Sequence, residues 1–172
     1  VYIRHGCVMA LAAINDPKTL SSYSKNNSQA IRMGALLALR QLESQEISGF
    51  LSDSNQEIVD ESARAIYDIP ITNSLKDLAQ TINISNSKTP HNLRRVLAAN
   101  RRIGDGKSAV DIAKVASNKQ TPVPIAIEAL QYLEKWGEDS KRDFITGLAR
   151  PTPASNKSDA VYALKSNLPF LL

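Results

Sequence analysis

Four arginines near the middle of the chain, Arg94, Arg95, Arg101 and Arg102, are the residues best suited to bind a charged group. The two adjacent pairs lie seven residues apart, so on a helix they return to nearly the same side. Guanidinium groups can bind a phosphate, a carboxylate or an acidic protein surface. The pattern predicts a solvated helix face or, as the alternative, a partner or anion site. Nucleic acid is the least favoured partner, because no aromatic side chains for base stacking are interleaved.

The rest of the chain offers few groups that could converge for catalysis or metal binding. Neither His5 nor His91 has a His, Cys or carboxylate at metal-ligand spacing. The acidic pairs at 60–61 and 138–139 point about 100° apart on a helix, so we expect them to be solvated charges. No glycine-rich phosphate loop or nucleophile-elbow sequence is present. We therefore expect no catalytic residue, no metal site and no cofactor.

The elements that carry these residues follow a repeated pattern. It consists of a small residue, two variable residues, Ala, an apolar residue, two variable residues and a further residue that is usually apolar. The central alanines are Ala10, Ala38, Ala65, Ala99, Ala129 and Ala163. They are separated by 28, 27, 34, 30 and 34 residues. Such spacing within one copy forms one face of a helix, and recurrence at about 20–50 residues is typical of stacked helical repeats.

A shorter second helix is expected after each of the first five copies. The candidate ranges are 17–25, 45–51, 73–82, 109–116 and 140–148. The polar segments 84–90 and 150–157 lengthen two intervals and are expected to be loops. No stretch alternates with period two over the length of a strand. We therefore predict an all-α fold, a right-handed α–α superhelix of about six helix pairs.

The whole chain, residues 1–172, is expected to form a single domain. The expected repeats span about 1–26, 27–53, 54–86, 87–118, 119–150 and 151–172. No stretch reaches the roughly 18–20 apolar residues of a membrane span, so no membrane insertion is expected. The net charge of +4 is uneven, because residues 87–172 hold 14 Lys and Arg against 8 Asp and Glu. This end of the chain could attract an acidic partner.

Several single residues carry further expectations. Asn100 occupies a position where the other copies have Leu or Ile, so we expect it to be buried and bonded to a backbone group at a helix end, a structural role. Cys7 takes the small-residue position of the first copy and is expected to be buried. Tyr132 and Trp136 lie four residues apart and are expected to pack in the core against Phe144 of a following helix. If exposed, they would instead indicate a docking surface.

Helix pairs of about 30 residues with alanine at the close-contact positions resemble the HEAT-repeat (armadillo-like) family. Arg4 and Arg32, three residues before the small residue, match a basic position common in those repeats. The third to fifth copies have Val59, Leu93 and Val123 there, so a continuous charged ladder is not expected. The resemblance covers the whole chain and implies a protein-binding scaffold.

A narrower resemblance rests on phrases that follow one another in order. They are VMALAAINDP (8–17), LLALRQL (36–42), RAIYDIPI (64–71), LAANRRIG (97–104) and EALQYLEKWGEDSKRDFITGLARPTP (128–153). They resemble the helical-repeat region of bacterial heme-binding, membrane-bound-type dehydrogenases, in which a β-propeller precedes the repeats and a cytochrome c domain often follows. The resemblance implies a non-catalytic spacer or docking module of a larger, extracytoplasmic (periplasmic) oxidoreductase.

The family's catalytic and heme-binding residues have no matching positions in this chain, which lacks a Cys-x-x-Cys-His sequence. The chain starts at Val1 and ends in apolar residues, so we expect a piece of a longer protein. A stand-alone protein-binding module and, less favoured, a nucleic-acid-binding repeat domain remain the alternatives.

Overall fold

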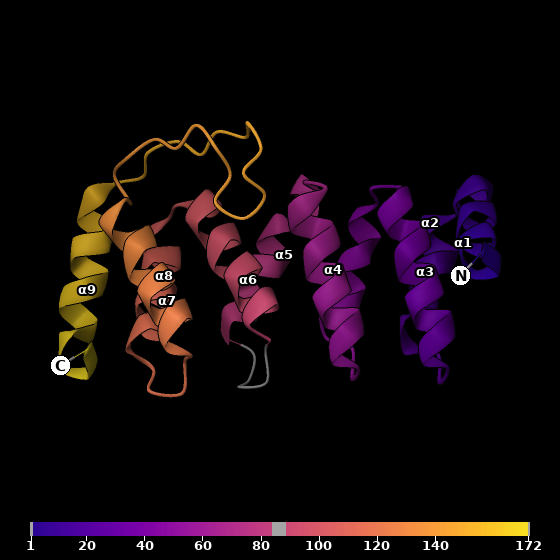
Figure 1. The fold of residues 1–172 in the computed structure, drawn as a ribbon, viewed down its shortest axis with the longest axis horizontal. Coiled ribbons are helices and arrows are strands. Elements are labelled where there is room, and N and C mark those ends of the chain that lie inside the picture. Colours follow the sequence, from indigo (N-terminus) through magenta and orange to yellow (C-terminus); the bar gives the residue numbers. More distant parts are fainter. Residues whose placement is uncertain (1, 84–88, 172) are drawn as a thin grey trace. The chain divides into compact units, whose positions relative to one another are not determined.

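The computed structural model describes residues 2–83 and 89–171 of the chain. Helices account for 72% of the structure. Within the described ranges no strand forms, and the only β pairing is an isolated antiparallel bridge between Ser140 and Thr152. The predicted all-α class is therefore confirmed (Figure 1).

All six copies of the repeated pattern lie on α-helices, and in the second and third copies the last residue, Leu42 or Ile69, directly follows the helix end. These helices are α1 (Tyr2–Ile14), α3 (Gln29–Gln41), α4 (Gln56–Asp68), α6 (Pro90–Ile103), α8 (Val123–Glu134) and α9 (Lys157–Leu171). Four of the five expected second helices are present. They are α2 (Pro17–Ser22) with η1 (Tyr23–Lys25), the 3₁₀ helix η2 (Gln45–Phe50), the run η3 (Thr72–Ser74), α5 (Leu75–Gln80) and η4 (Thr81–Asn83), and α7 (Gly106–Ser117).

Short polar side chains define where these helices begin. Asn55 accepts hydrogen bonds from the Glu57 and Ile58 amides at the start of α4. Thr89 accepts from the Asn92 amide at the start of α6, which has Pro in its first turn. These side chains satisfy amides that have no partner within the helix, and so they favour a helix start at these positions.

The chain divides into two compact units, residues 1–78 and 79–172. In the first unit α3 packs against α1, α2 and α4. Its core is fully buried and includes Leu36, Leu39, Phe50 and Ile66. In the second unit α7 packs against α6, α8 and α9, and α6 also contacts α8. The central alanines of α6, α8 and α9 are buried at these seams.

The fifth expected second helix, 140–148, was predicted wrongly. The segment belongs instead to a long loop, which we call the α8–α9 loop, between Lys135 and Asn156 (Figure 1). The Asp143 carboxylate binds the amides of Ile145 and Thr146 and the Thr146 hydroxyl, and Gly147 adopts a positive φ of 69°. A side chain that satisfies nearby amides in this way offers the backbone an alternative to a helix.

The remaining expectations about local structure concern Cys7 and two loops. Cys7 is exposed, so its predicted burial is wrong. On α1 only Val8 and Ala12 are buried, and no described element covers the face that carries Cys7. Of the expected loop at 84–90, residues 84–88 lie outside the described residues. The expected loop at 150–157 is present up to Asn156, and α9 begins at Lys157.

Candidate functional site

The arginine cluster is positioned by α6, and its last two members lie in the last turn of that helix. The helix ends at Gly104, which adopts the left-handed conformation with a φ of 68°. Positive side chains at this end are favourable because the carboxyl end of a helix carries partial negative charge. The turn at Gly104 leaves Arg101 and Arg102 facing the α8–α9 loop.

Arg101 is buried, with 1% of its surface exposed. Its guanidinium lies over the Trp136 ring, 5.2 Å from the ring centroid. Four acceptors receive its hydrogen bonds: the carbonyls of Lys135 (3.2 Å), Glu138 (2.8 Å) and Pro153 (3.3 Å) and the Ser155 hydroxyl (3.3 Å). Arg101 therefore joins both ends of the loop to α6, and its bond to Lys135 also caps the end of α8.

Burial is the largest cause that lowers the pKa of the Arg101 guanidinium below its ordinary value. An arginine nevertheless keeps its charge at neutral pH, because its ordinary pKa lies above about 12. The charge is therefore held in place by carbonyl dipoles and the face of Trp136.

Arg102 holds the middle of the loop. It donates to the Asp143 carboxylate at 2.8 Å and to the carbonyls of Arg150 at 2.9 Å and Pro151 at 3.2 Å. The Asp143 side chain is fully buried. The second oxygen of Asp143 makes the three bonds within the loop described above, so one carboxylate links the loop's tight turn to α6.

The loop also binds itself. The amides and carbonyls of Ser140 and Thr152 are paired at 2.9 and 2.8 Å, and the Ser155 amide donates to the Trp136 carbonyl at 2.9 Å. The Ala154 amide donates to Asp139 at 2.7 Å. Together with the two arginines, these bonds fix the loop in a defined conformation across the ends of α6 and α8 (Figure 1).

This arrangement revises the interpretation of the arginine cluster. The prediction of a solvated face is wrong for Arg101, and Arg102 is only partly exposed. Arg94 forms an ion pair with Glu128 of α8 at 2.7 Å, and Arg95 donates to the His91 carbonyl one turn earlier. The four arginines therefore bind groups within the second unit. Arg101 and Arg102 hold the α8–α9 loop, so a partner site would lie on that loop and not on the arginines themselves.

The aromatic residues lie beneath and beside the loop. Trp136 is fully buried, and Tyr132 is 3% exposed. Tyr132 packs edge-on against Phe144, with ring centroids 5.1 Å apart. The predicted burial of Tyr132 and Trp136 is confirmed, and Tyr132 does pack against Phe144. Phe144, however, comes from the loop and not from a helix, and it remains 38% exposed.

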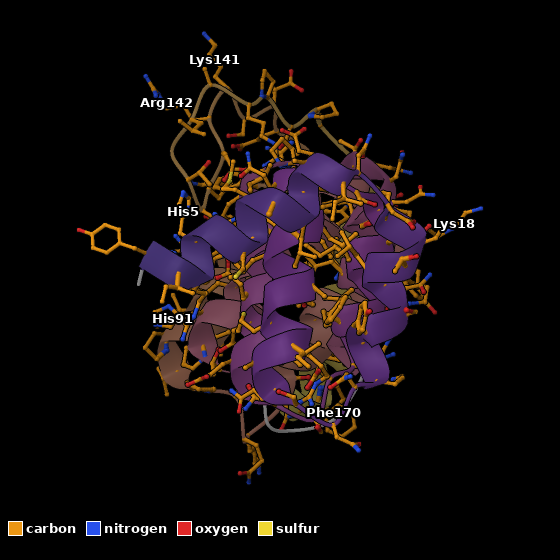
Figure 2. The ribbon with its side chains drawn as sticks, turned by 90° about the vertical axis from the view of Figure 1, so that its right-hand side faces the viewer. His5, Lys18, His91, Lys141, Arg142 and Phe170 are labelled. Carbon is orange, nitrogen blue, oxygen red and sulfur yellow. The ribbon has the colours of Figure 1, made fainter. Side chains whose placement is uncertain are left out.

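Two shallow grooves flank Lys135 and Phe144. One, of about 250 Å³, lies along α8 and is lined by Arg94, Glu128 and Tyr132 among others. The other, of about 380 Å³, lies within the loop and includes Lys141 and Arg142. Figure 2 shows the side chains of Lys141 and Arg142 projecting outward from the loop. The surface thus combines a partly exposed aromatic ring with basic side chains, and Glu138 and Asp139 also line the second groove. We call Lys135, Lys141, Arg142, Phe144 and Leu148 the loop surface.

Asn100 lies on the same helix, one residue before Arg101. It is 3% exposed, and its amide donates to the Ala79 carbonyl in the last turn of α5 at 3.0 Å and to the Val96 carbonyl at 2.9 Å. Carbonyls in the last turn of a helix lack partners within that helix. The side chain therefore ties α6 to the end of α5, and no ligand contact is needed to explain it.

The two histidines lie on different units of the chain. His5 lies on α1 and His91 on α6, and no group of three or more His, Cys, Asp or Glu residues within 2–83 and 89–171 could hold a metal ion. The same part of the chain contains no helix long and apolar enough to cross a membrane. Comparison with protein-family models, with curated proteins and with solved structures finds no match to this chain.

Proposed function

We propose that this chain is a non-catalytic protein-interaction module built from HEAT-like helix pairs, and that the loop surface is where it binds a protein partner. The observation that carries the proposal is the fixed conformation of the α8–α9 loop. Ordered loops longer than about 12–15 residues without secondary structure are uncommon and usually functional. Here a buried arginine and a buried carboxylate hold such a loop, so that it presents exposed apolar and basic side chains.

Contacts between successive helix pairs support the repeat architecture. Four side-chain hydrogen bonds join residues about one repeat apart, with separations of 28, 29, 28 and 34 residues. They are Gln29–Glu57, Ser74–Gln45 (carbonyl), Asn83–Asp111 and Arg94–Glu128. Equivalent positions of neighbouring repeats meet in this way in a stack. A right-handed superhelix of about six pairs, the last two separated by the loop, is the arrangement we propose.

The loop surface favours a partner segment with carboxylates beside an apolar residue. Phe144 and Leu148 are 38% and 60% exposed and can be covered by apolar side chains. Lys141 can pair with carboxylates at the edge of that contact. Arg142 can do so as well, although its guanidinium also donates to the Gly147 carbonyl at 2.9 Å. Because the loop is held before binding, little conformational entropy is lost when a partner docks.

The experiment is selection from a displayed peptide library against the full chain, followed by affinity measurements with variants. Peptides enriched in Asp, Glu and apolar residues should bind the wild type. The double variant Lys141→Glu with Arg142→Glu should weaken them about tenfold or more, because attraction becomes repulsion. The matched control is Lys119→Glu with Lys165→Glu, two exposed lysines outside the loop, which should leave the affinity unchanged.

Two outcomes would overturn the proposal. One is that no enriched peptide depends on the loop surface. The other is salt-sensitive binding of duplex DNA that the loop variants abolish, which would support the nucleic-acid alternative. Enzymatic turnover by the purified chain would contradict the non-catalytic assignment.

We also propose, on the resemblance of the ordered phrases alone, that the module belongs to a larger extracytoplasmic dehydrogenase. Sequencing the gene beyond both ends tests this directly. A β-propeller upstream and a Cys-x-x-Cys-His sequence downstream would support it. Reading frames with neither would leave a stand-alone protein-binding module.

A further inference from the structure

A second surface, on the first unit, has the form of a binding groove. Two cavities of about 470 and 480 Å³ open along α3, and Arg4 of α1 lines both. Ala30, Met33, Leu37 and Gln41 of α3 contribute to their linings. These positions are three or four residues apart, so they form one stripe along the helix. We call the two cavities together the α3 groove.

The groove has the length and lining that suit a helix. From Ala30 to Gln41 the stripe extends roughly 17 Å, at about 1.5 Å per residue, which corresponds to three turns of a partner helix. Val8 and Met9 of α1 and Ile69 at the end of α4 add to the apolar lining. The residues that form the groove come from helices and helix ends, so an extended peptide would find no strand edge with which to pair.

Both methionines of the chain, Met9 and Met33, line the groove. Met9 is 42% exposed, and Met33 is half-buried. The methionine side chain is flexible and polarizable, so it adapts to apolar side chains of different shape and is common at surfaces that accept helices. Their placement gives the groove an adaptable apolar lining.

The charges along the groove are unequal. Arg4 and His5 on the α1 side are exposed and form no ion pair with any described residue. On the α4 side, Glu57 accepts a hydrogen bond from Gln29, and Arg40 is paired with Glu61. Arg4 therefore offers a positive charge on the α1 edge of the groove, while the exposed Glu57 carboxylate adds a negative charge on the α4 side.

We propose that the α3 groove binds an amphipathic helix of a partner protein, which places an apolar stripe over Met33 and Leu37 and carboxylates beside Arg4 and His5. This proposal extends the proposed function as a protein-binding module but uses a different unit and different residues. If binding at one of the two surfaces is refuted, the variants of the other surface still test that surface independently.

The test uses the full chain and a designed probe. The probe is a helical peptide of about four turns with Leu at every third or fourth position and Glu along one flank. A matched peptide has Lys in place of each Glu. Cys7 is the only cysteine, is exposed and lies on α1, so an environment-sensitive fluorophore attached to it reports on binding nearby. Isothermal calorimetry with unlabelled protein checks that the label does not create the signal.

Three variants locate the peptide. Arg4→Glu should weaken the Glu peptide about tenfold and strengthen the Lys peptide, because the sign of the edge charge is reversed. Met9→Glu should abolish binding of both by placing a charge in the apolar lining. Lys18→Glu is the control and should change neither affinity more than about twofold, since Lys18 lies on the opposite side of the first unit from His5 (Figure 2). All three side chains are exposed, so folding should survive, and circular dichroism verifies this.

Several results would overturn the proposal. These are equal binding of the two peptides, binding insensitive to Met9→Glu, or no binding of the Glu peptide at millimolar concentration. Concentration-dependent self-association that Met9→Glu abolishes would identify a second copy of the chain as the occupant. Binding of phosphatidylglycerol vesicles through Arg4, with no binding of the peptide, would identify a lipid surface. If the loop-surface variant Lys141→Glu with Arg142→Glu no longer binds the Glu peptide, the peptide binds the second unit and not the α3 groove.

Discussion

Replacing Arg101 by Met should release the α8–α9 loop while leaving the helices of the second unit folded. Met fills much of the same volume but cannot donate the four hydrogen bonds, at 2.8–3.3 Å, that Arg101 makes to both ends of the loop. Each buried acceptor that loses its donor and finds no water costs about 1–3 kcal/mol. The Arg101 Nε has no hydrogen-bond partner among the described residues, so the variant also removes an unsatisfied donor, and we expect a net loss of about 3 kcal/mol.

The loss should appear as local opening of the loop. About 3 kcal/mol corresponds to a roughly 100-fold larger open population, and trypsin cleavage after Lys141 or Arg142 should accelerate by a similar factor. Mass spectrometry of the first cleavage products measures this. Trp136 is the only tryptophan and lies under Arg101, so its fluorescence should shift toward that of a solvated indole.

Two further variants decide the interpretation. Arg101→Lys keeps a charge but not the planar fork of donors, so its cleavage rate should lie between those of the wild type and Arg101→Met. Arg95→Met removes an arginine of the same helix that donates to the His91 carbonyl, and we expect it to cost less than about 1 kcal/mol. If Arg101→Met and Arg95→Met accelerate cleavage equally, the loop is not held by Arg101 and the reasoning about the site is wrong.

Other predictions follow from single contacts. Asn100→Leu should lower the free energy of unfolding of the second unit by about 1–3 kcal/mol in urea titrations, because it leaves a buried carbonyl without its donor; a stabilised variant would reject the structural role. Gly104→Ala should lower the free energy of unfolding by about 1–2 kcal/mol, because φ is 68° and the new Cβ would clash with the Ser155 hydroxyl oxygen. Gly34→Ala should raise the free energy of unfolding by about 0.5–1 kcal/mol, because Gly34 lies within a helix and its new Cβ would meet open space. Burial raises the pKa of Asp53, but hydrogen bonds from Arg32 and the Asn55 amide together lower it by more. The folded pKa of Asp53 therefore lies below its unfolded value. Its contribution to stability should therefore be complete above about pH 4 and be lost as the pH falls through the lower, folded value, and Asp53→Asn should weaken this acid dependence when unfolding is followed by circular dichroism.

The helical fold follows from the sequence because two local signals agree. The apolar spacing around the central alanines sets the buried face, and side chains such as Asn55 and Thr89 set where helices start. Both signals act within a few residues. For this reason the six first helices could be predicted without knowledge of their neighbours.

The fifth second helix could not be predicted by the same means. Phe144, Ile145 and Leu148 have helical spacing, but Asp143 binds the following amides and Gly147 needs a positive φ. In the sequence, Asp143 and Gly147 therefore favour a turn over a helix. Arg102, 41 residues earlier, ties Asp143 to α6, and no local pattern shows that pairing.

The candidate site shows the same limit. A helical wheel places Arg101 and Arg102 on one side of α6, but it does not show whether another segment covers that side. Once the α8–α9 loop lies there, Arg101 becomes buried and Trp136 becomes its partner. Cys7 shows the reverse, since its position in the repeat implies burial but no described element covers it.

The separation in sequence between Arg101 and its acceptors has a consequence for biosynthesis. The first acceptor lies 34 residues later and the last 54 residues later. During translation α6, α7 and α8 can therefore associate while this guanidinium is still hydrated, and the loop closes only after Ser155 has left the ribosome. Because contacts between distant residues form slowly, the loop should be assembled late and, until then, Trp136 should lie open to chaperones and proteases.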